Sequence, residues 1–353
     1  MKKIIEPEHN LPQKAPSAHD VARLAGVSRT QVSYVLNGIR STHVSAQKRE
    51  RILEAAKTLG YRPHYSAQSL RRGYSSEFAI FFPAPYNSRI VNIIGTIHEE
   101  GLSGECVVIQ YSWNSHHDPE RKNKAFYAML ARRPLGIFCS LLDLEREDID
   151  AARASGVERI LVLDVERHSD LNTFFLPVEE IGRIAAAHLL SRGHRRIAVI
   201  RPGDPVQNRP FQLRYRGMMA AAAETGGAAI DILDFPKKDM APSLAAARIF
   251  TTGLLALPKR PTAIYAYSDD YALPLMTALQ EAGIRIPQDI AILGTDDLPY
   301  GELYTPALST IRFDESALGE RAVALINSLI TGEPVERRFL QEPLPYLVGR
   351  EST

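Results

Sequence analysis

The sequence predicts a small all-helical unit followed by a larger α/β unit with two doubly wound parallel-sheet lobes. In the first part, up to residue 59, apolar residues recur at the three- and four-residue spacing of amphipathic helices. From Glu77 onward, short apolar runs alternate with helical stretches, which is typical of parallel strands covered on both faces. This alternation starts again at Arg196, so two separate sheets are expected.

The first helix is expected to begin just after residue 17. Ser17 and Asp20 form a variant of the capping box, and Gly26 can supply the positive φ that ends the helix. The side that we expect to be buried comprises Val21, Ala22, Leu24 and Ala25.

The second helix follows a tight turn and has a narrow apolar stripe. Ser28 can cap its first N–H groups, and the stripe comprises Val32, Val35 and Leu36. Its other side chains can form hydrogen bonds and are expected to face a partner: Arg29, Thr30, Gln31, Ser33, Tyr34 and Asn37. A third helix is expected at 45–59, with Ile52, Leu53, Ala56 and Leu59 as its apolar set.

Three short helices with a glycine turn match a helix-turn-helix, whose second helix enters the major groove of DNA. The alternative is a small helical bundle with a solvated face. Charge favours the first interpretation, because residues 1–75 contain 13 Lys and Arg against 5 Asp and Glu, a net charge of +8. The rest of the chain contains 29 against 36, a net charge of −7, so positive charge is concentrated where phosphates would be met.

Three runs, HDVARLAGVSRTQVSYVLNG, VSAQKRERILEAAKTLGYRPH and AQSLRRG, resemble the N-terminal segment of the LacI/GalR family of bacterial transcription regulators. The resemblance implies a disordered tail at 1–16, a DNA-binding domain at 17–62 and a hinge helix linker at 63–76. It implies DNA contacts from Ser17, Ser28 and the outward side chains of the second helix. Tyr34 stands where many members carry an Arg that reads a guanine, so a different operator half-site is expected.

The hinge segment of this family folds only on operator DNA and lies in the minor groove. Leu70 matches the leucine that acts as a wedge at the central base step, and Ala67 matches the small residue near the groove floor. The alternative is an ordinary tether, with Leu70 docked on the core.

Residues 77–353 resemble the type I periplasmic sugar-binding fold, with the markers HLLSRGHRRIAVI, RYRGMMAA, AILGTDDLPYGELYTPALSTI and LVGREST. The resemblance implies three crossings between the lobes. We expect an N-lobe at about 77–191 and 311–341 and a C-lobe at about 192–310 and 342–353. Ligands of such sheets bind outside the carboxyl ends of the strands, so the cleft between the lobes is the expected effector site.

Several residues near the expected strand ends match effector contacts of the family. Arg214 matches the Arg that reaches into the cleft, and Asp296 matches an acidic residue that binds ligand hydroxyls. Such a pair suits a polyhydroxylated ligand, because each group can make paired charge-assisted hydrogen bonds. The remaining matches are Ser268 or Asp269, Phe313, and Glu180, whose side chain is longer than the Asp that is common there. Without the resemblance, the favoured interpretation is that Arg214 is a surface residue and that Asp296 caps a turn.

The sequence favours no other class of protein. It contains no GxSxG, no P-loop, no GxGxxG after a strand and no zinc motif, so no enzymatic function and no cofactor or metal are expected. No apolar run is long enough for a membrane span or a signal peptide, which disfavours the alternative of a sugar-binding receptor or transport component. Cys106 and Cys139 are expected to be buried, reduced thiols, and Trp113 is expected beside the cleft, in the core or at an interface.

The expected protein is therefore a cytoplasmic, nucleoid-associated transcription regulator, and the resemblance favours a repressor. Its expected partners are double-stranded operator DNA and a small effector, a carbohydrate or related polar metabolite. A homodimer is expected because two linked helical units gain effective concentration at the half-sites of a palindrome, and tetramer formation is left open.

Overall fold

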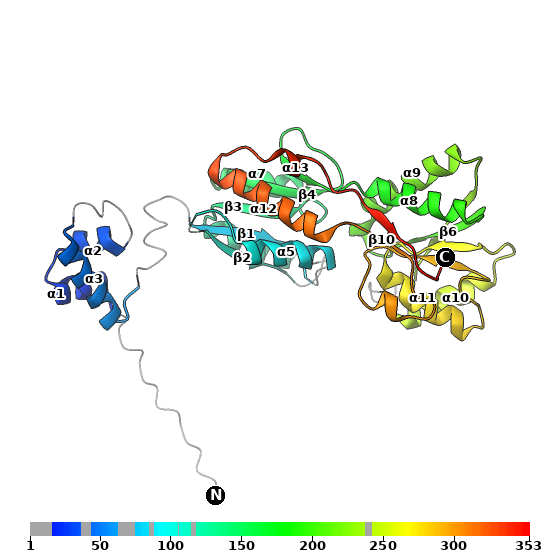
Figure 1. Cartoon of the computed structure of the whole chain (residues 1–353), viewed down its shortest axis with the longest axis horizontal. Helices are drawn as coiled ribbons and strands as arrows, with labels where there is room; N and C mark the ends of the chain where they lie inside the picture. Colours follow the sequence, from blue (N-terminus) through cyan, green and yellow to red (C-terminus); the bar gives the residue numbers. More distant parts are fainter. Residues whose placement is uncertain are drawn as a thin grey trace, which may run out of the picture. The chain divides into compact units, whose positions relative to one another are not determined.

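The computed structural model divides the chain into two units, Met1–Ser75 and Ser76–Thr353. It describes residues 16–36, 44–62, 75–84, 88–104, 106–113, 118–236 and 242–353. Figure 1 shows the helical elements of the first unit and the sheets and helices of the second.

The first unit contains the helices α1 (Ala18–Ala25), α2 (Arg29–Leu36) and α3 (Ala46–Thr58). The predicted capping box is confirmed, because Ser17 accepts a hydrogen bond from the Asp20 N–H while the Asp20 carboxylate accepts one from the Ser17 N–H. Gly26 ends α1 with a φ of 63°, the left-handed conformation expected of it. A small core of buried side chains joins the helices: Val21, Ala22, Ala25, Val32, Val35, Val44, Ile52, Ala55 and Ala56.

Two leucines that the sequence analysis assigned to this core are exposed instead. Leu24 is 54% exposed and Leu53 is 49% exposed. A helix turns by about 100° per residue, so Leu24 points away from the face shared by Val21 and Ala25, and Leu53 points away from the face centred on Ile52.

The N-lobe of the second unit is built on a parallel sheet of order β2-β1-β3-β4-β5. Its strands are β1 (Glu77–Phe81), β2 (Val107–Tyr111), β3 (Gly136–Ser140), β4 (Arg159–Asp164) and β5 (Asn172–Phe175). The helices α5 (Ser88–Glu100), α6 (Pro119–Ala131) and α7 (Arg146–Ala154) connect them. Every residue of β1 and β3 is buried, as the continuous apolar runs predict for strands covered on both faces.

The C-lobe has a second parallel sheet of order β7-β6-β8-β9. Its strands are β6 (Arg196–Arg201), β7 (Ala229–Asp234), β8 (Ala263–Tyr265) and β9 (Ala291–Leu293). In Figure 1, α8 (Val178–Ser191) and α9 (Asn208–Glu224) lie on one side of this sheet, and α10 (Leu244–Leu255) and α11 (Asp269–Glu281) lie on the other. The two-sheet architecture confirms the predicted fold class.

The helix α8 belongs with the C-lobe, whereas the sequence analysis placed residues 178–191 in the N-lobe. It packs along α9, and the two helices approach closely at Gly182 and Gly217. An added Cβ at Gly182 would lie 1.8 Å from the Arg214 carbonyl oxygen. The first crossing between the lobes therefore comes before α8, between β5 and Val178.

The chain returns to both lobes at its C-terminal end. After a 3₁₀ turn at Gly301–Leu303, the strand β10 (Thr310–Arg312) pairs antiparallel with β11 (Tyr346–Val348). Between them, α12 (Glu315–Thr331) packs against α5 of the N-lobe and is followed by α13 (Arg337–Leu340). Ser352 then bonds back to β9 of the C-lobe, where its hydroxyl donates to the Ile292 carbonyl at 2.6 Å.

Three further predictions concern buried residues and the membrane. Cys139 is buried, but Cys106 is only half-buried, so the expectation of two buried thiols holds for one of them. Trp113 is 5% exposed and stacks on Phe81 with 4.7 Å between ring centroids, which places it in the core of the N-lobe. Within the described residues, no helix is long and apolar enough to cross a bilayer.

Candidate functional site

The start of α2 is fixed by a reciprocal pair of hydrogen bonds. The Ser28 hydroxyl accepts from the Gln31 N–H, and the Gln31 side-chain oxygen accepts from the Ser28 N–H, each at 3.2 Å. This cap confirms that Ser28 caps the second helix, and it holds the Gln31 side chain against the helix end. Arg29 and Thr30 remain exposed at the same end of the helix. The first turn of α2 therefore presents a cation and a hydroxyl on a rigid support.

The remaining residues predicted to contact DNA differ in their surroundings. Ser33 is half-buried, next to the apolar stripe residues Val32 and Val35, which are buried as predicted. Tyr34, expected to face outward, is half-buried and packs on the core of the helical unit. Ser17 is the N-cap of α1. Asn37, Ala67 and Leu70 lie outside the described residues.

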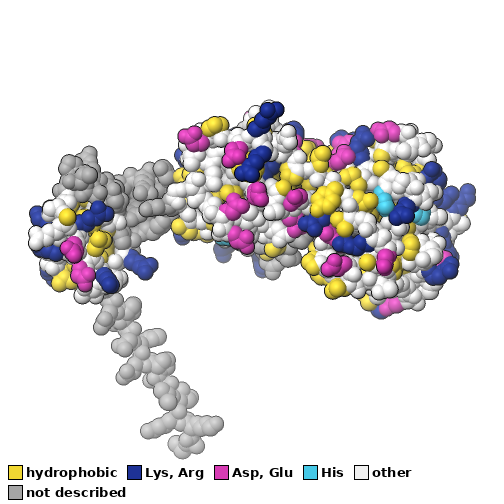
Figure 2. Space-filling model, viewed as in Figure 1, with side chains coloured by type: hydrophobic (Ala, Val, Ile, Leu, Met, Phe, Trp, Pro, Cys, Tyr) yellow, Lys and Arg dark blue, Asp and Glu magenta, His cyan; other side chains and the backbone are white. Residues whose placement is uncertain are grey.

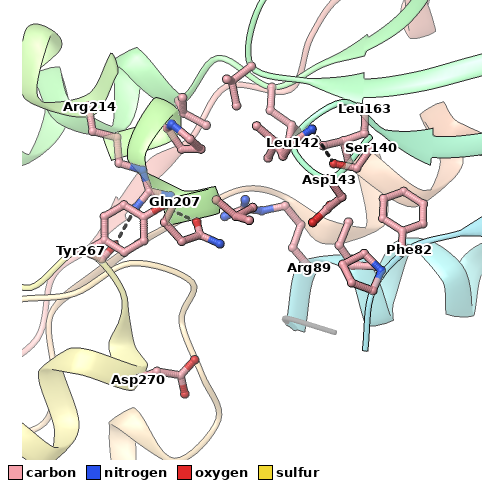
Figure 3. Close-up of a pocket in the computed structure, with 17 residues that line it drawn as sticks. Phe82, Arg89, Ser140, Leu142, Asp143, Leu163, Gln207, Arg214, Tyr267 and Asp270 are labelled. Atoms are coloured by element: carbon pink, nitrogen blue, oxygen red, sulfur yellow. Dashed lines mark hydrogen bonds between the residues drawn. The ribbon is translucent and has the colours of Figure 1, made fainter. Parts of the chain in front are cut away.

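Within the second unit, a cavity of about 280 Å³ lies between the lobes. Its walls come from segments that follow β1, β3, β4 and β8, and from α5, α9 and α11, so it occupies the carboxyl-end edge of both sheets. Figure 3 shows these side chains. The lining comprises Phe82, Pro83, Arg89, Ile90, Ser140, Leu142, Asp143, Leu163, Val165, Leu176, Val178, Val206, Gln207, Pro210, Arg214, Tyr267 and Asp270.

Arg214 supplies the buried cation of this cavity. Its side chain projects from α9 and lies over the Tyr267 ring, with its guanidinium carbon 4.3 Å from the ring centroid. Nη1 donates to the Tyr267 carbonyl at 2.6 Å and to the Tyr265 hydroxyl at 3.2 Å. The residue is only 5% exposed, and its buried Nε has no hydrogen-bond partner. One edge of the guanidinium is thus held by the C-lobe while Nε is left unsatisfied.

The other polar groups of the C-lobe wall surround Arg214. The Tyr267 hydroxyl donates to the Gln207 side-chain oxygen at 2.5 Å, which fixes the orientation of both. Tyr267 has a φ of 38°, a left-handed backbone conformation that residues other than glycine adopt at a cost in free energy. Asp270, in the first turn of α11, makes no hydrogen bond or ion pair with another described residue. Burial, followed by the charge of Asp296, raises the pKa of the Asp270 carboxyl.

The N-lobe wall is mostly apolar. Phe82, Leu163, Val165 and Leu176 are each at most 5% exposed, and all four line the cavity. In Figure 3, Phe82, Leu142 and Leu163 lie across the cavity from Arg214 and Tyr267. A ligand in this space would therefore meet mostly hydrocarbon on the N-lobe side, together with the polar side chains of Arg89, Ser140 and Asp143, and hydrogen-bonding groups on the other side.

Asp296, predicted to bind ligand hydroxyls, is ion-paired across the lobes. The Arg89 Nη2 on α5 donates to the Asp296 Oδ1 at 2.6 Å, and their side chains are only 11% and 17% exposed. Arg89 also lies over the Phe313 ring, 4.9 Å from its centroid. Asp296 has a φ of 103°, so its backbone is strained where the pair forms. Its carboxylate is engaged by the N-lobe rather than left open to the cavity.

A second ion pair joins the lobes through Asp164 at the end of β4. Arg209 on α9 donates to the Asp164 carboxylate, and His168 Nε2 lies 2.6 Å from its other oxygen. Asp164 has no exposed surface, and it also accepts from the Val165 N–H at 2.6 Å. This carboxylate is therefore neutralised within the protein.

The other predicted effector residues do not line the cavity. Asp269 is fully buried, and its carboxylate accepts from the Leu298 N–H at 2.9 Å and from the Thr310 hydroxyl at 2.7 Å. Ser268 precedes α11 and is 8% exposed, and Phe313 is 2% exposed beneath Arg89. Glu180 lies in the first turn of α8. Of the six residues predicted to bind the effector, the structure brings only Arg214 to the cavity wall, and the roles of the others remain predictions.

Six polar residues of the cavity wall were missed by the sequence analysis: Arg89, Ser140, Asp143, Gln207, Tyr267 and Asp270. Tyr267 and Asp270 flank the predicted Ser268 and Asp269 directly after β8, so the strand end itself was the signal that could have found them. Arg89 and Gln207 carry no such signal. Their position depends on how α5 and the turn before α9 approach the other lobe.

Comparisons with known proteins agree with both parts of the architecture. The model of the lacI family of bacterial regulatory proteins matches residues 17–64, and that of a periplasmic binding protein-like domain matches residues 186–353. The chain is 30% identical over 344 residues to the HTH-type transcriptional regulator GntR of Pseudomonas aeruginosa, covering 96% of each chain. It is 29% identical over 338 residues to the transcriptional repressor PurR of Vibrio cholerae, covering 94% of this chain and 96% of that protein.

A solved structure of the lac repressor dimer, bound to operator and the anti-inducer ONPF, matches with a TM-score of 0.76 at 27% identity. The match covers 96% of this chain and 99% of that chain. These relatives are regulators, which disfavours the alternative of a receptor or transport component. Both halves of the architecture and the full-length relatives lead to one conclusion: the chain belongs to the lacI family of bacterial regulatory proteins.

Proposed function

We propose that this transcription regulator is a repressor that reads its operator with the exposed end of α2. The observation that carries the proposal is the capped first turn, in which Arg29 and Thr30 are exposed while the Ser28–Gln31 cap holds the helix start. Such a turn can place two different hydrogen-bonding side chains against base edges or phosphates without ordering a loop. Ser17, Ser33, Tyr34, Asn37, Ala67 and Leu70 are proposed as further contacts, on the basis of the family resemblance.

The test is to select duplexes from a random library with the full chain and then to titrate the selected duplex with variants. Arg29→Ala and Thr30→Ala should each weaken specific binding, by about 1–3 kcal/mol if the side chain reads a base. Glu54→Ala, an exposed change on α3 in the same unit, is the control that should not weaken it. Failure to enrich any sequence, or unchanged affinity in both variants, would contradict the proposal.

We further propose that the cavity between the lobes holds a small polar effector, a carbohydrate or a related metabolite, and that its binding changes operator affinity. The cavity lies between two lobes joined by the ion pairs Arg89–Asp296 and Arg209–Asp164. The two lobes can be in equilibrium between two arrangements. A ligand that binds one arrangement more tightly shifts this equilibrium by the difference between its binding free energies for the two arrangements.

The proposed assembly is a homodimer that acts in the cytoplasm on a palindromic site and has no enzymatic activity. The support is the effective-concentration argument and the solved lac repressor structure, which is a dimer bound to operator. Sedimentation velocity on the full chain would test the assembly.

A further inference from the structure

The free edge of the Arg214 guanidinium points to the chemistry of the effector. Nη1 is used by the Tyr265 hydroxyl and the Tyr267 carbonyl, whereas Nε and Nη2 make no hydrogen bond to a described residue. These two nitrogens form one edge of the planar group, and two parallel N–H groups on one edge match the two oxygens of a carboxylate. Arg214 lines the cavity and so brings an unused bidentate donor to its wall, on a residue that is 95% buried and whose Nε has no solvent-exposed surface.

Arg214 also forms no ion pair with a described residue. Among the described residues, no carboxylate lies within ion-pair distance of it, although buried charges in proteins are usually paired. Two carboxylates of the neighbouring segments are bonded to other groups, although the charge of Asp296 still acts on Arg214. Asp296 is bonded to Arg89, and Asp164 is bonded to Arg209 and lies 2.6 Å from His168. A negative group on the ligand would supply the missing counter-charge.

The rest of the cavity fits the remainder of such a ligand. The N-lobe wall of Phe82, Leu163, Val165 and Leu176 favours an apolar face. Asp270 lines the cavity away from Arg214 and has an unoccupied carboxylate, which calls for a hydroxyl or another hydrogen-bond donor. A single ligand can satisfy both only if it carries an acceptor at one end and a donor at the other.

We propose that the effector is a small organic acid whose carboxylate binds the Nε and Nη2 edge of Arg214 and whose other end donates a hydrogen bond to Asp270. The proposal rests on the proposed function of the cavity and narrows it. A hydroxylated acid, including a sugar acid, has the required groups, whereas a neutral sugar leaves the charge of Arg214 unpaired.

The experiment compares matched acids and neutral analogues on the full chain. The pairs are gluconate with glucitol, lactate with lactamide, and 4-hydroxybenzoate with 4-hydroxybenzamide. Binding is followed by the rise in the unfolding midpoint and confirmed by calorimetry. The expected result is that at least one acid stabilises the protein and its neutral partner binds about tenfold more weakly or worse, because a charge-assisted pair is lost.

Variants assign the effect to Arg214. Arg214→Met should abolish the preference for the acid, and Arg214→Lys should retain part of it because the charge remains. Arg216→Met is the matched control, since Arg216 lies on the same helix but is exposed and paired with Glu179. The proposal is overturned if a neutral partner binds as tightly as its acid, if Arg214→Met keeps the preference, or if no acid binds.

Operator titration of the same variants separates this proposal from the proposed function. Specific DNA binding by Arg214→Met and Arg214→Lys would show that the chains fold and read DNA. If the parent protein binds its operator but no acid is preferred, only the proposed ligand class is wrong. If the parent protein does not bind an operator, the proposed function itself is wrong.

Discussion

Asp269 shows how a single buried carboxyl can act on the stability of the protein. It has no exposed surface, and its two oxygens accept hydrogen bonds from the Leu298 N–H and the Thr310 hydroxyl. Burial raises the pKa of this carboxyl from 3.8 to about 7, against the effect of these two hydrogen bonds. The folded protein therefore keeps a proton on Asp269 at pH values where the unfolded chain has lost it.

This difference makes stability depend on pH in a defined direction. Between pH 4 and 7 the folded state binds the extra proton, so the free energy of unfolding should fall as pH rises, by at most about 1.4 kcal/mol per pH unit. Asp269→Asn should remove this contribution. We expect the stability difference between variant and parent to move in favour of the variant from pH 4 to pH 7, as measured by urea unfolding. A difference that stays constant over this range would contradict the assignment.

Some of the site residues could be predicted from the sequence and others could not, for physical reasons. Arg214 could be found from the sequence because it lies in a recognisable run, RYRGMMAA, and the structure brings it from α9 to the cavity. The pairing of Asp296 with Arg89 could not, because the two residues are separated by 207 positions and meet only when the lobes approach. Tyr34 was expected outside because of its hydroxyl, but its ring is large enough to pack on a small core.

At the level of elements, the contact between α8 and α9 depends on two glycines. A Cβ at Gly182 would lie 1.8 Å from the Arg214 carbonyl oxygen, and one at Gly217 would lie 2.1 Å from the Glu179 carbonyl oxygen. Both clashes are with backbone atoms, so neither can be relieved by a side-chain rotation. This close approach fixes the backbone of Arg214 and with it the position of the guanidinium in the cavity.

Gly182→Ala should therefore force the two helices apart. We expect a loss of about 1–3 kcal/mol or more in the free energy of unfolding, the usual cost of overpacking. The matched control is Gly253→Ala in α10, where an added Cβ meets no atom within 4 Å. That variant should gain about 0.4–1 kcal/mol, because alanine restricts the unfolded chain. Similar effects of the two changes in chemical denaturation would show that the close approach is unimportant.

The ion pair between α5 and the segment after β9 links the lobes. Arg89 and Asp296 are 11% and 17% exposed, whereas the Arg201–Asp234 pair, within the C-lobe, is 40% and 65% exposed. Solvent weakens exposed pairs, so the two should differ in strength although both have good geometry.

A double-mutant cycle on unfolding measures this difference. The cycle of Arg89→Met with Asp296→Asn should give a coupling energy of about 1.5–3 kcal/mol, as expected for a shielded hydrogen bond between charged groups. The cycle of Arg201→Met with Asp234→Asn should give about 0–1 kcal/mol. Equal coupling energies in the two cycles would show that the shielded Arg89–Asp296 pair is no stronger than an exposed pair. Its contribution to holding the lobes together would then be small.

The elements with the strongest sequence signals were predicted best. The helix α1 begins after Ser17 and ends at Gly26, as expected from its capping box and its glycine. The strand β5 was not predicted, because it has only four residues, Asn172–Phe175, and begins with two polar side chains. Likewise, α8 was assigned to the wrong lobe, since periodicity identifies a helix but not the sheet it covers.

For the whole molecule, the distribution of charge assigns DNA binding and effector binding to different units. Residues 1–75 carry a net charge of +8 and the remainder a net charge of −7. Figure 2 shows acidic and basic side chains interspersed on the visible face of the α/β unit. Long-range attraction to phosphates should therefore act on the helical unit, while the α/β unit repels DNA weakly and remains available to its ligand.

The central claim is that the chain binds a specific DNA sequence through its helical unit. It is tested most directly by titrating the full chain against its selected duplex and a shuffled duplex of the same length at several salt concentrations. We predict tighter binding to the selected duplex at every concentration, and a log–log salt slope of about −0.9 for each phosphate contacted. Equal affinity for the two duplexes at all salt concentrations would contradict the claim.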